Sequence, residues 1–300
     1  MLRTILCGFA LVGMLQAQTQ PSAAVSPSEA AVSQEAAPIY RIRVVGRTTK
    51  AVNYRRDGSS TPIDFRGTVL LPEAEGSARV KANKGSTEVR AKFKKLPAPT
   101  RFGLEYLTYV LWAITPEGRA INMGEILTDN DFEGKLNVTS DLQAFAMIVT
   151  AEPYFSVTQP SDVVVMENAV NKNTVGRIEL VDANYELLKR GEYSYDTAAA
   201  QADTGTREKL PMDRYEALVA VYQAQNAVQI AESLGAQQHA AETLAKAQQL
   251  LLTSRQLYDR KSDTRTIIQT ARQAAQTAED ARLITIARQE RENAARAAAN

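Results

Sequence analysis

Residues 212–300 contain no proline and only one glycine, Gly235, so nothing else in this stretch interrupts a helix. The predicted helices cover 213–234, 239–260 and 264–299. We expect Gly235 to end the first helix and Asp263 to cap the third. The second helix spaces its small and apolar residues by 4-3-4-3-4, through Ala240, Leu244, Ala247, Leu251, Ser254 and Tyr258. Because short connections favour antiparallel neighbours, residues 211–300 predict an Ala-rich antiparallel helical hairpin or a three-helix, coiled-coil-like bundle.

Residues 39–168 follow a period of two instead. The clearest example alternates three apolar residues with three cations, namely Val89, Ala91 and Phe93 with Arg90, Lys92 and Lys94. Turn pairs such as Asp57-Gly58 and Lys84-Gly85 separate short β-rich runs. Short strands without helical crossovers predict an antiparallel β-sandwich over 39–168, with Trp112 in its core. The predicted fold class is therefore α+β.

The amino-terminal segment has the layout of an export signal. A positive charge precedes an apolar run of eleven residues, 5–15, and Ala17 is a small residue at the expected cleavage point. We therefore predict a signal peptide over 1–17. Residues 18–38 are rich in Gln, Ser, Ala and Pro, which predicts a disordered linker. A lipoprotein signal at Cys7 is the alternative, and this cysteine is the only one in the chain.

Residues 169–210 join the two regular parts and predict a connector with one short helix. The helix is expected over 178–190, where Leu180, Leu187 and Leu188 are among the apolar residues. Gly191 is the expected stop for this helix.

The sequence offers little for catalysis. His239 is the only histidine and falls between the first two long helices, where we expect a surface capping role. No Ser-x-x-Lys motif, glycine-rich phosphate loop or Asp-rich calcium loop occurs. Glu105 and Glu152 are the only paired-carboxylate candidates, and we expect both to be solvated. The chain is therefore predicted to be no enzyme, with no catalytic residue, no cofactor and no metal.

Cations gather in the first half of the predicted β-sandwich, although the net charge of the whole chain is only +1. The candidate contacts for an anionic polymer are Arg41, Arg43, Arg90, Lys92 and Lys94. Alternation places Arg41 with Arg43 on one face, and the other three cations likewise. Such rows can hold anionic glycans, lipid phosphates or peptidoglycan carboxylates. The alternative is a solvated face whose lysines discourage aggregation.

Two resemblances add to this interpretation. The segment Tyr109–Gly118, with 144–153 and 163–165, resembles the extracytoplasmic domain of the anti-sigma-factor K type, which implies an immunoglobulin-like β-sandwich. Residues 227–287 are similar to an Ala-rich helical-hairpin domain of unknown function found in bacterial envelope proteins associated with the OmpA family. In those proteins an OmpA-like domain often follows. The sequence reaches Asn300 within the third helix, so we expect no such domain and carry over none of its peptidoglycan-binding residues.

These observations predict a non-enzymatic structural or interaction protein of the periplasm or of the periplasmic face of the outer membrane. The β-sandwich would be a docking module, and the helices a spacer or assembly surface. Expected partners are envelope proteins or an anionic cell-wall or lipid surface, with no nucleic acid, no membrane span in the mature chain and possible self-association through the helices. The alternatives are a periplasmic holdase chaperone with helical arms and an anti-sigma-like sensor fragment.

Overall fold

The protein is described by a computed structural model that covers residues 49–129, 131–169, 174, 177–181 and 211–299. The expected signal peptide (1–17) and linker (18–38) lie outside the described residues, as do Arg41, Arg43 and most of the connector. All of the described residues fall in one compact unit, so the sheet and the helices that follow it belong together.

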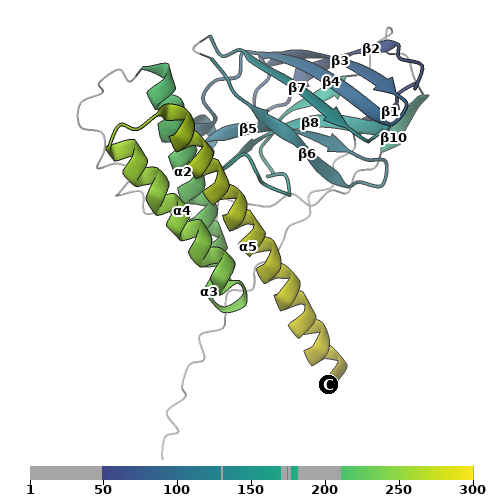
Figure 1. Ribbon diagram of the computed structural model, residues 1–300. Coiled ribbons are helices and arrows are strands. Elements are labelled where there is room, and N and C mark those ends of the chain that lie inside the picture. The colour runs from purple at the N-terminus through teal and green to yellow at the C-terminus, as the bar shows by residue number, and fades with distance from the viewer. Residues whose placement is uncertain (1–48, 130, 170–173, 175–176, 182–210, 300) are drawn as a thin grey trace, which may run out of the picture. The chain divides into compact units, whose positions relative to one another are not determined.

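An antiparallel, nearly closed β-sheet, barrel-like or sandwich-like in form, occupies the first half of the described chain (Figure 1). Its strands are β1 (Thr49–Asn53), β2 (Ser60–Gly67), β3 (Glu75–Asn83), β4 (Ser86–Lys94), β5 (Thr108–Ile114), β6 (Ala120–Ile126), β7 (Gly134–Ser140), β8 (Ala144–Glu152), β9 (Val164–Ala169) and β10 (Arg177–Val181). They pair in the order β10-β1-β8-β9-β2-β3-β4-β7, and β5 joins through β8 and also pairs with β6. The α+β class is as predicted.

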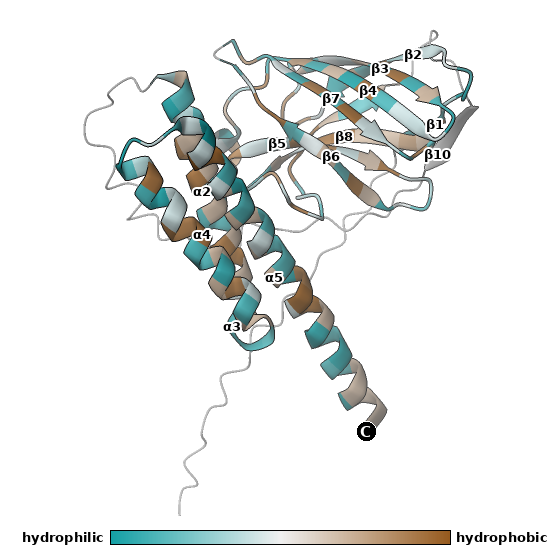
Figure 2. Cartoon of the chain, viewed as in Figure 1, coloured by the Kyte–Doolittle hydropathy of each residue, from teal (hydrophilic) through white to brown (hydrophobic). Residues whose placement is uncertain are grey.

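Strand burial follows the sequence alternation. In β4, Val89, Ala91 and Phe93 are buried between exposed cations, and β3 alternates in the same way (Figure 2). Strand β5 differs because all of its residues are buried, which is typical of a strand covered on both faces. Trp112 lies in the core as predicted, and its indole N–H donates to the Thr150 hydroxyl at 2.8 Å.

The helices follow the sequence prediction closely. They are α2 (Met212–Ser233), α3 (Ala236–His239), α4 (Ala241–Asp259) and α5 (Thr264–Ala299), and the 3₁₀ turn η1 (Pro99–Phe102) lies in the sheet part. Gly235 adopts a left-handed φ of 87° after α2. Asp263 caps α5 by accepting a bond from the Thr266 amide at 3.0 Å. At the start of α2 no side chain makes a cap hydrogen bond, so Asp213 and Glu216, although spaced like a capping box, do not form one.

Alanine fills the contact between the helices. Ala247 of α4 and Ala271, Ala274 and Ala278 of α5 are fully buried, which lets the helix axes approach closely. The apolar cluster formed by this contact continues into the sheet through Tyr154 and Val157. Helix α5 runs past its neighbours, and its residues from 290 to 299 are exposed (Figure 1). Among the described helices, none combines the length and apolarity that crossing a membrane needs.

Residues 177–181 correct one expectation. We expected a short helix to begin at 178, but these residues form β10, paired antiparallel with β1 from Thr49↔Val181 to Asn53↔Arg177. The physical reason is that an unpaired strand edge offers backbone partners to any segment with a two-residue alternation. Ile178 and Leu180 alternate with polar neighbours as well as fitting a helix. The rest of the expected helix lies outside the described residues.

Overpacking tests the alanine contact. Ala274→Leu inserts three carbons where the side chain is fully buried, so we expect a loss of about 1–3 kcal/mol in the free energy of unfolding. Urea unfolding followed by circular dichroism at 222 nm measures this loss. The matched control is Ala295→Leu on the exposed end of α5, which should change the stability little. Equal stability of the two variants would contradict close packing at Ala274.

Candidate functional site

Strand β4 presents the predicted cations on one exposed face. Arg90, Lys92 and Lys94 are all exposed and alternate with buried residues, so the prediction that they share a face is confirmed. Arg41 and Arg43 lie outside the described residues, so the prediction for these two stays a prediction. The candidate surface is therefore the exposed face of β3, β4 and β7.

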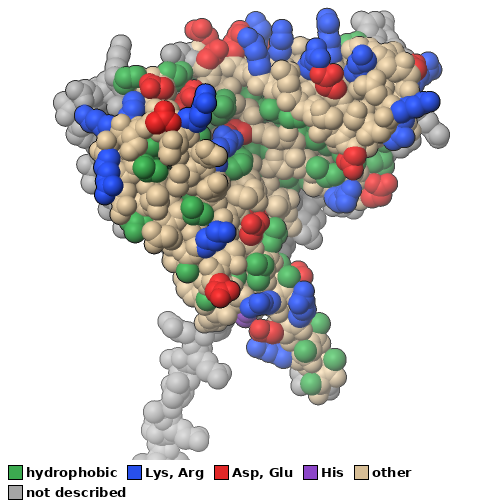
Figure 3. Space-filling view, in the orientation of Figure 1, with side chains coloured by type: hydrophobic (Ala, Val, Ile, Leu, Met, Phe, Trp, Pro, Cys, Tyr) green, Lys and Arg blue, Asp and Glu red, His purple; other side chains and the backbone are tan. Residues whose placement is uncertain are grey.

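Register brings two further cations to this face. Arg79 of β3 is directly opposite Arg90, and Lys135 of β7 is directly opposite Lys92. We call Arg79, Arg90, Lys92 and Lys135 the basic quartet. Lys and Arg side chains follow one another along this part of the molecule in the space-filling view (Figure 3). The sequence analysis missed Lys135 because a period of two identifies the face of a strand but not its neighbour across the sheet.

The basic quartet contains two like-charge cross-strand pairs, and such pairs destabilise a sheet. Arg90 is partly compensated by Glu88, whose carboxylate lies 2.6 Å from its guanidinium. Lys94 is compensated by Glu133 at 3.0 Å and contributes less to the positive field. Within the described part of the chain, no ion pair involves the other three members of the quartet. The repulsion within the two like-charge pairs is therefore relieved only in part, at Arg90.

Removing one cation should relieve the repulsion. Lys135→Gln eliminates one like-charge pair without touching the core, so we expect the melting temperature to rise by about 1 °C at low salt. The gain should vanish at 1 M salt, where the Debye length falls to about 3 Å. Differential scanning calorimetry at both salt concentrations checks this. Lys246→Gln, on the exposed surface of α4, is the control, and an equal gain there would contradict specific repulsion at β7.

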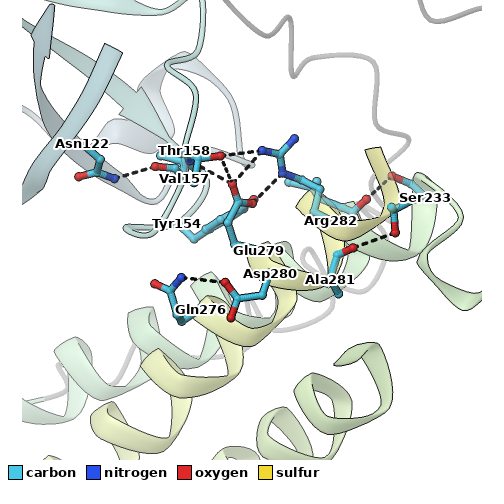
Figure 4. Close-up of polar contacts among 12 residues, drawn as sticks. Asn122, Tyr154, Val157, Thr158, Ser233, Gln276, Glu279, Asp280, Ala281 and Arg282 are labelled. Atoms are coloured by element: carbon cyan, nitrogen blue, oxygen red, sulfur yellow. Dashed lines mark hydrogen bonds and ion pairs between the residues drawn. The ribbon is translucent and has the colours of Figure 1, made fainter. Parts of the chain in front are cut away.

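A second polar cluster joins the sheet to helix α5 (Figure 4). The Tyr154 hydroxyl donates to Glu279 Oε2 at 2.6 Å, and the Thr158 amide and hydroxyl donate to Oε1 at 3.0 and 2.6 Å. Arg282, one turn along α5, donates to both carboxylate oxygens at 2.7 and 2.8 Å and also to the Thr158 hydroxyl at 2.9 Å. We call these four residues the clasp, because they connect α5 to the segment after β8.

Both charges of the clasp are buried. Glu279 has no exposed surface and Arg282 keeps 2%. Burial alone would raise the pKa of Glu279, but the hydrogen bonds and charge of Arg282 and the bonds from Thr158 and Tyr154 outweigh it and lower that pKa from 4.5 to about 2. The carboxylate is therefore ionised in the folded protein at any physiological pH.

A third contact lies nearby. Glu125 of β6 has a side chain only 4% exposed and accepts bonds from the Thr108 hydroxyl and the Gln223 amide, each at 2.8 Å. The Arg272 guanidinium also donates to Glu125 and lies 4.1 Å from the centre of the Phe155 ring. The sheet is thus connected to α2 and to α5 by hydrogen-bonded carboxylates.

Sequence reasoning missed the clasp. Glu279 and Arg282 stand three residues apart, which is the spacing of an ordinary exposed helix ion pair. The signal that could have singled them out is their position next to Ala278 and Ala281, which continue the helical spacing of Ile267, Ala271 and Ala274. When the buried face of a helix is wide, the positions beside its apolar residues are buried too, and a charged residue at such a position needs a partner of opposite charge.

Neutralising Glu279 should weaken the fold in a pH-dependent way. Glu279→Gln leaves Arg282 buried without its counter-charge, which typically costs ~3–5 kcal/mol. In the wild type the carboxyl has a pKa of about 2 when folded against 4.5 when unfolded, so its contribution is complete above pH 4.5 and is lost as the pH falls towards 2. Urea unfolding at pH 7 and pH 3 should show a smaller difference between variant and wild type at pH 3.

The exposed Glu290→Gln on the same helix is the control and should match the wild type at both pH values. A double variant, Glu279→Gln with Arg282→Met, should recover part of the loss because no unpaired charge stays buried. A single variant that unfolds like the wild type at pH 7 would show that the clasp contributes nothing.

The other polar candidates have structural surroundings. His239 makes no cap hydrogen bond; it ends α3, and its Nδ1 lies 3.4 Å from Glu292, so the expected capping role is wrong. Glu152 is fully buried rather than solvated and accepts bonds from the Thr150 hydroxyl at 2.6 Å and the Ser161 amide at 2.7 Å. In the described ranges, no group of three or more His, Cys, Asp or Glu side chains is placed to hold a metal ion.

No protein-family model matches the chain, and no curated protein matches it. The function is therefore assigned from the geometry of two features. These are the clasp and the exposed face of β3, β4 and β7 that carries the basic quartet, which we call the basic face.

Proposed function

We propose that this protein is an exported, non-enzymatic component of the bacterial cell envelope that docks on an anionic cell-wall polymer through its basic face. The export signal predicted over 1–17 supports the compartment. In this proposal the sheet is an immunoglobulin-like sandwich acting as the docking module. The Ala-rich helical hairpin or bundle is a spacer or assembly surface held by the clasp.

The basic quartet is the observation that carries this proposal. Arg79 opposite Arg90 and Lys92 opposite Lys135 repel each other, and a face selected only for solubility would alternate the signs of its charges. A polyanion lying across the strands turns this repulsion into binding energy. Side chains two residues apart on one strand stand about 7 Å from each other, so a row of them presents a regular series of cations.

The surroundings of the quartet favour a polymer over a lipid surface. Within the described sheet, the exposed large apolar residues lie in loops, at Val69, Leu70, Leu104, Leu127 and Phe132. The quartet face itself offers no such residue for insertion between lipid tails. The chaperone alternative needs a continuous apolar face along the helical arms, whereas the alanine contact between α4 and α5 is buried. The large apolar residues that the helices do expose are scattered over α2, α4 and α5.

Sedimentation tests the docking. The purified protein should sediment with isolated cell-wall sacculi at about 0.05 M salt and remain in solution at 1 M, where the Debye length is about 3 Å. Replacing all four quartet residues by Gln should weaken binding at least tenfold. The fold should survive because exposed substitutions change stability by at most about 0.5 kcal/mol each.

The control removes the same charge elsewhere. Lys246, Arg255, Arg265 and Arg288 are exposed on α4 and α5, and changing all four to Gln should leave sedimentation nearly unchanged. Equal losses in both variants would mean that net charge alone matters. Binding by the wild type to phosphatidylglycerol vesicles but not to sacculi would replace the polymer by a lipid surface, and failure to bind either would overturn the proposal.

A further inference from the structure

A hollow of about 510 Å³ lies where the sheet meets helix α2. Its sheet wall is formed by the start of β5, the end of β6 and the β6–β7 loop. Its helical wall is formed by the first three turns of α2 together with Ile268 and Arg272 of α5. Tyr109, Ile126 and Val219 are among the residues that line it. The hollow uses no residue of the basic quartet and lies apart from the clasp, so neither site explains it.

Large apolar side chains stand exposed around this hollow. Leu127 is 57% exposed, Phe132 49%, Tyr215 51% and Met212 37%, and all four line it. The first two come from the β6–β7 loop and the last two from the start of α2. Exposed apolar residues gathered around a cavity mark an interaction site, whereas single ones are ordinary on a protein surface.

The β6–β7 loop holds Phe132 outward at a conformational cost. Phe132 has a left-handed φ of 60°, which bulky side chains rarely adopt. Its amide donates to the Asp129 carbonyl at 3.1 Å, and its carbonyl accepts from the Leu96 amide at 3.0 Å. The Asp129 carboxylate also accepts the Glu133 amide at 2.9 Å. Glycine or asparagine would fit this backbone with less strain, so a phenyl ring here points to a function for the ring itself.

The charges that line the hollow identify its partner. Glu125 is matched by Arg272, which leaves the exposed Asp129 and Glu216 as the unbalanced charges at the rim. This acidity repels an anionic lipid surface. A small molecule would fill the hollow and leave the apolar rim exposed. We propose that the hollow and its rim bind a polypeptide segment with one large apolar anchor flanked by Lys or Arg.

Both walls are held before any ligand arrives. The Gln223 amide of α2 and the Arg272 guanidinium of α5 both donate to Glu125 of β6. The side-chain oxygen of Gln223 in turn accepts a hydrogen bond from the Phe155 backbone amide at 2.8 Å. Since these contacts hold α2 against the sheet, the segment binds a preformed site and its anchor loses little affinity to rearrangement.

Labelled nonapeptides test the proposal on the full chain by fluorescence anisotropy. The panel places Trp, Phe, Leu or Gly at the centre and Lys, Gln or Glu at the two flanking positions on each side. Lys-flanked peptides with an apolar centre should bind at least tenfold more tightly than their Gly-centred or Glu-flanked counterparts. No such preference anywhere in the panel would overturn the proposal.

Substitutions locate the site. Phe132→Asn keeps a residue that accepts a left-handed backbone and should weaken binding at least tenfold without lowering the melting temperature. Tyr215→Gln should have a similar effect, and Glu216→Gln should cost about threefold and reduce the salt dependence. Leu252→Gln and Glu242→Gln, exposed on α4, are the matched controls. Wild-type affinity in Phe132→Asn would place the peptide elsewhere and refute the assignment.

Two further measurements separate this site from the other surfaces. The basic-quartet variant should bind the peptides like the wild type, so failure of one proposal leaves the other standing. Binding of phosphatidylglycerol vesicles that is lost in Phe132→Asn would show that the loop inserts into a lipid surface, and that result would overturn a polypeptide partner.

Discussion

The buried ion pair between Glu279 and Arg282 is the interaction on which the relation of sheet to helices depends. Neither charge could be buried alone, because the free-energy cost of desolvating it would exceed the gain from its remaining contacts. Arg282 neutralises the carboxylate, and Tyr154 and Thr158 fill its remaining acceptor positions. The Glu279 oxygens that pair with Arg282 within α5 therefore also attach this helix to the segment after β8. The apolar cluster shared by the sheet and the helices continues across this attachment through Tyr154.

Much of the architecture was readable because it depends on local rules. Gly235 and Asp263 set helix ends through their own backbone and side-chain chemistry, and the alternation around Phe93 identified a strand with one buried face. What stayed hidden depends on partners distant in the sequence. Nothing local could reveal that Ile178 joins the edge of β1, or that Glu279 meets a hydroxyl 125 positions away. Of the candidate site, only the cations on one face of β4 could be predicted from the sequence.

Two features of the surface lower the stability of the fold, one through charge repulsion and the other through backbone strain. The basic face keeps like charges opposite each other, and the β6–β7 loop keeps Phe132 in a strained backbone conformation. Both are tolerated because the strands behind them are strongly supported: β5 and nearly all of β8 are buried along their full length. A rigid sheet can carry local unfavourable features that a marginal one would relax away. As proposed, the two sites attract opposite charges, so their ligands would not compete.

The length of α5 leaves a short arm beyond its last contacts. The Gln289 side-chain amide donates to the Leu234 carbonyl at 2.9 Å, and Glu292 lies 3.4 Å from His239. From Glu292 to Ala299 the helix rises about 10 Å at 1.5 Å per residue, and all of these residues are exposed. A partner that grips this arm would therefore pull first on the turn between α2 and α3, and the clasp would carry only the load that this turn does not take up.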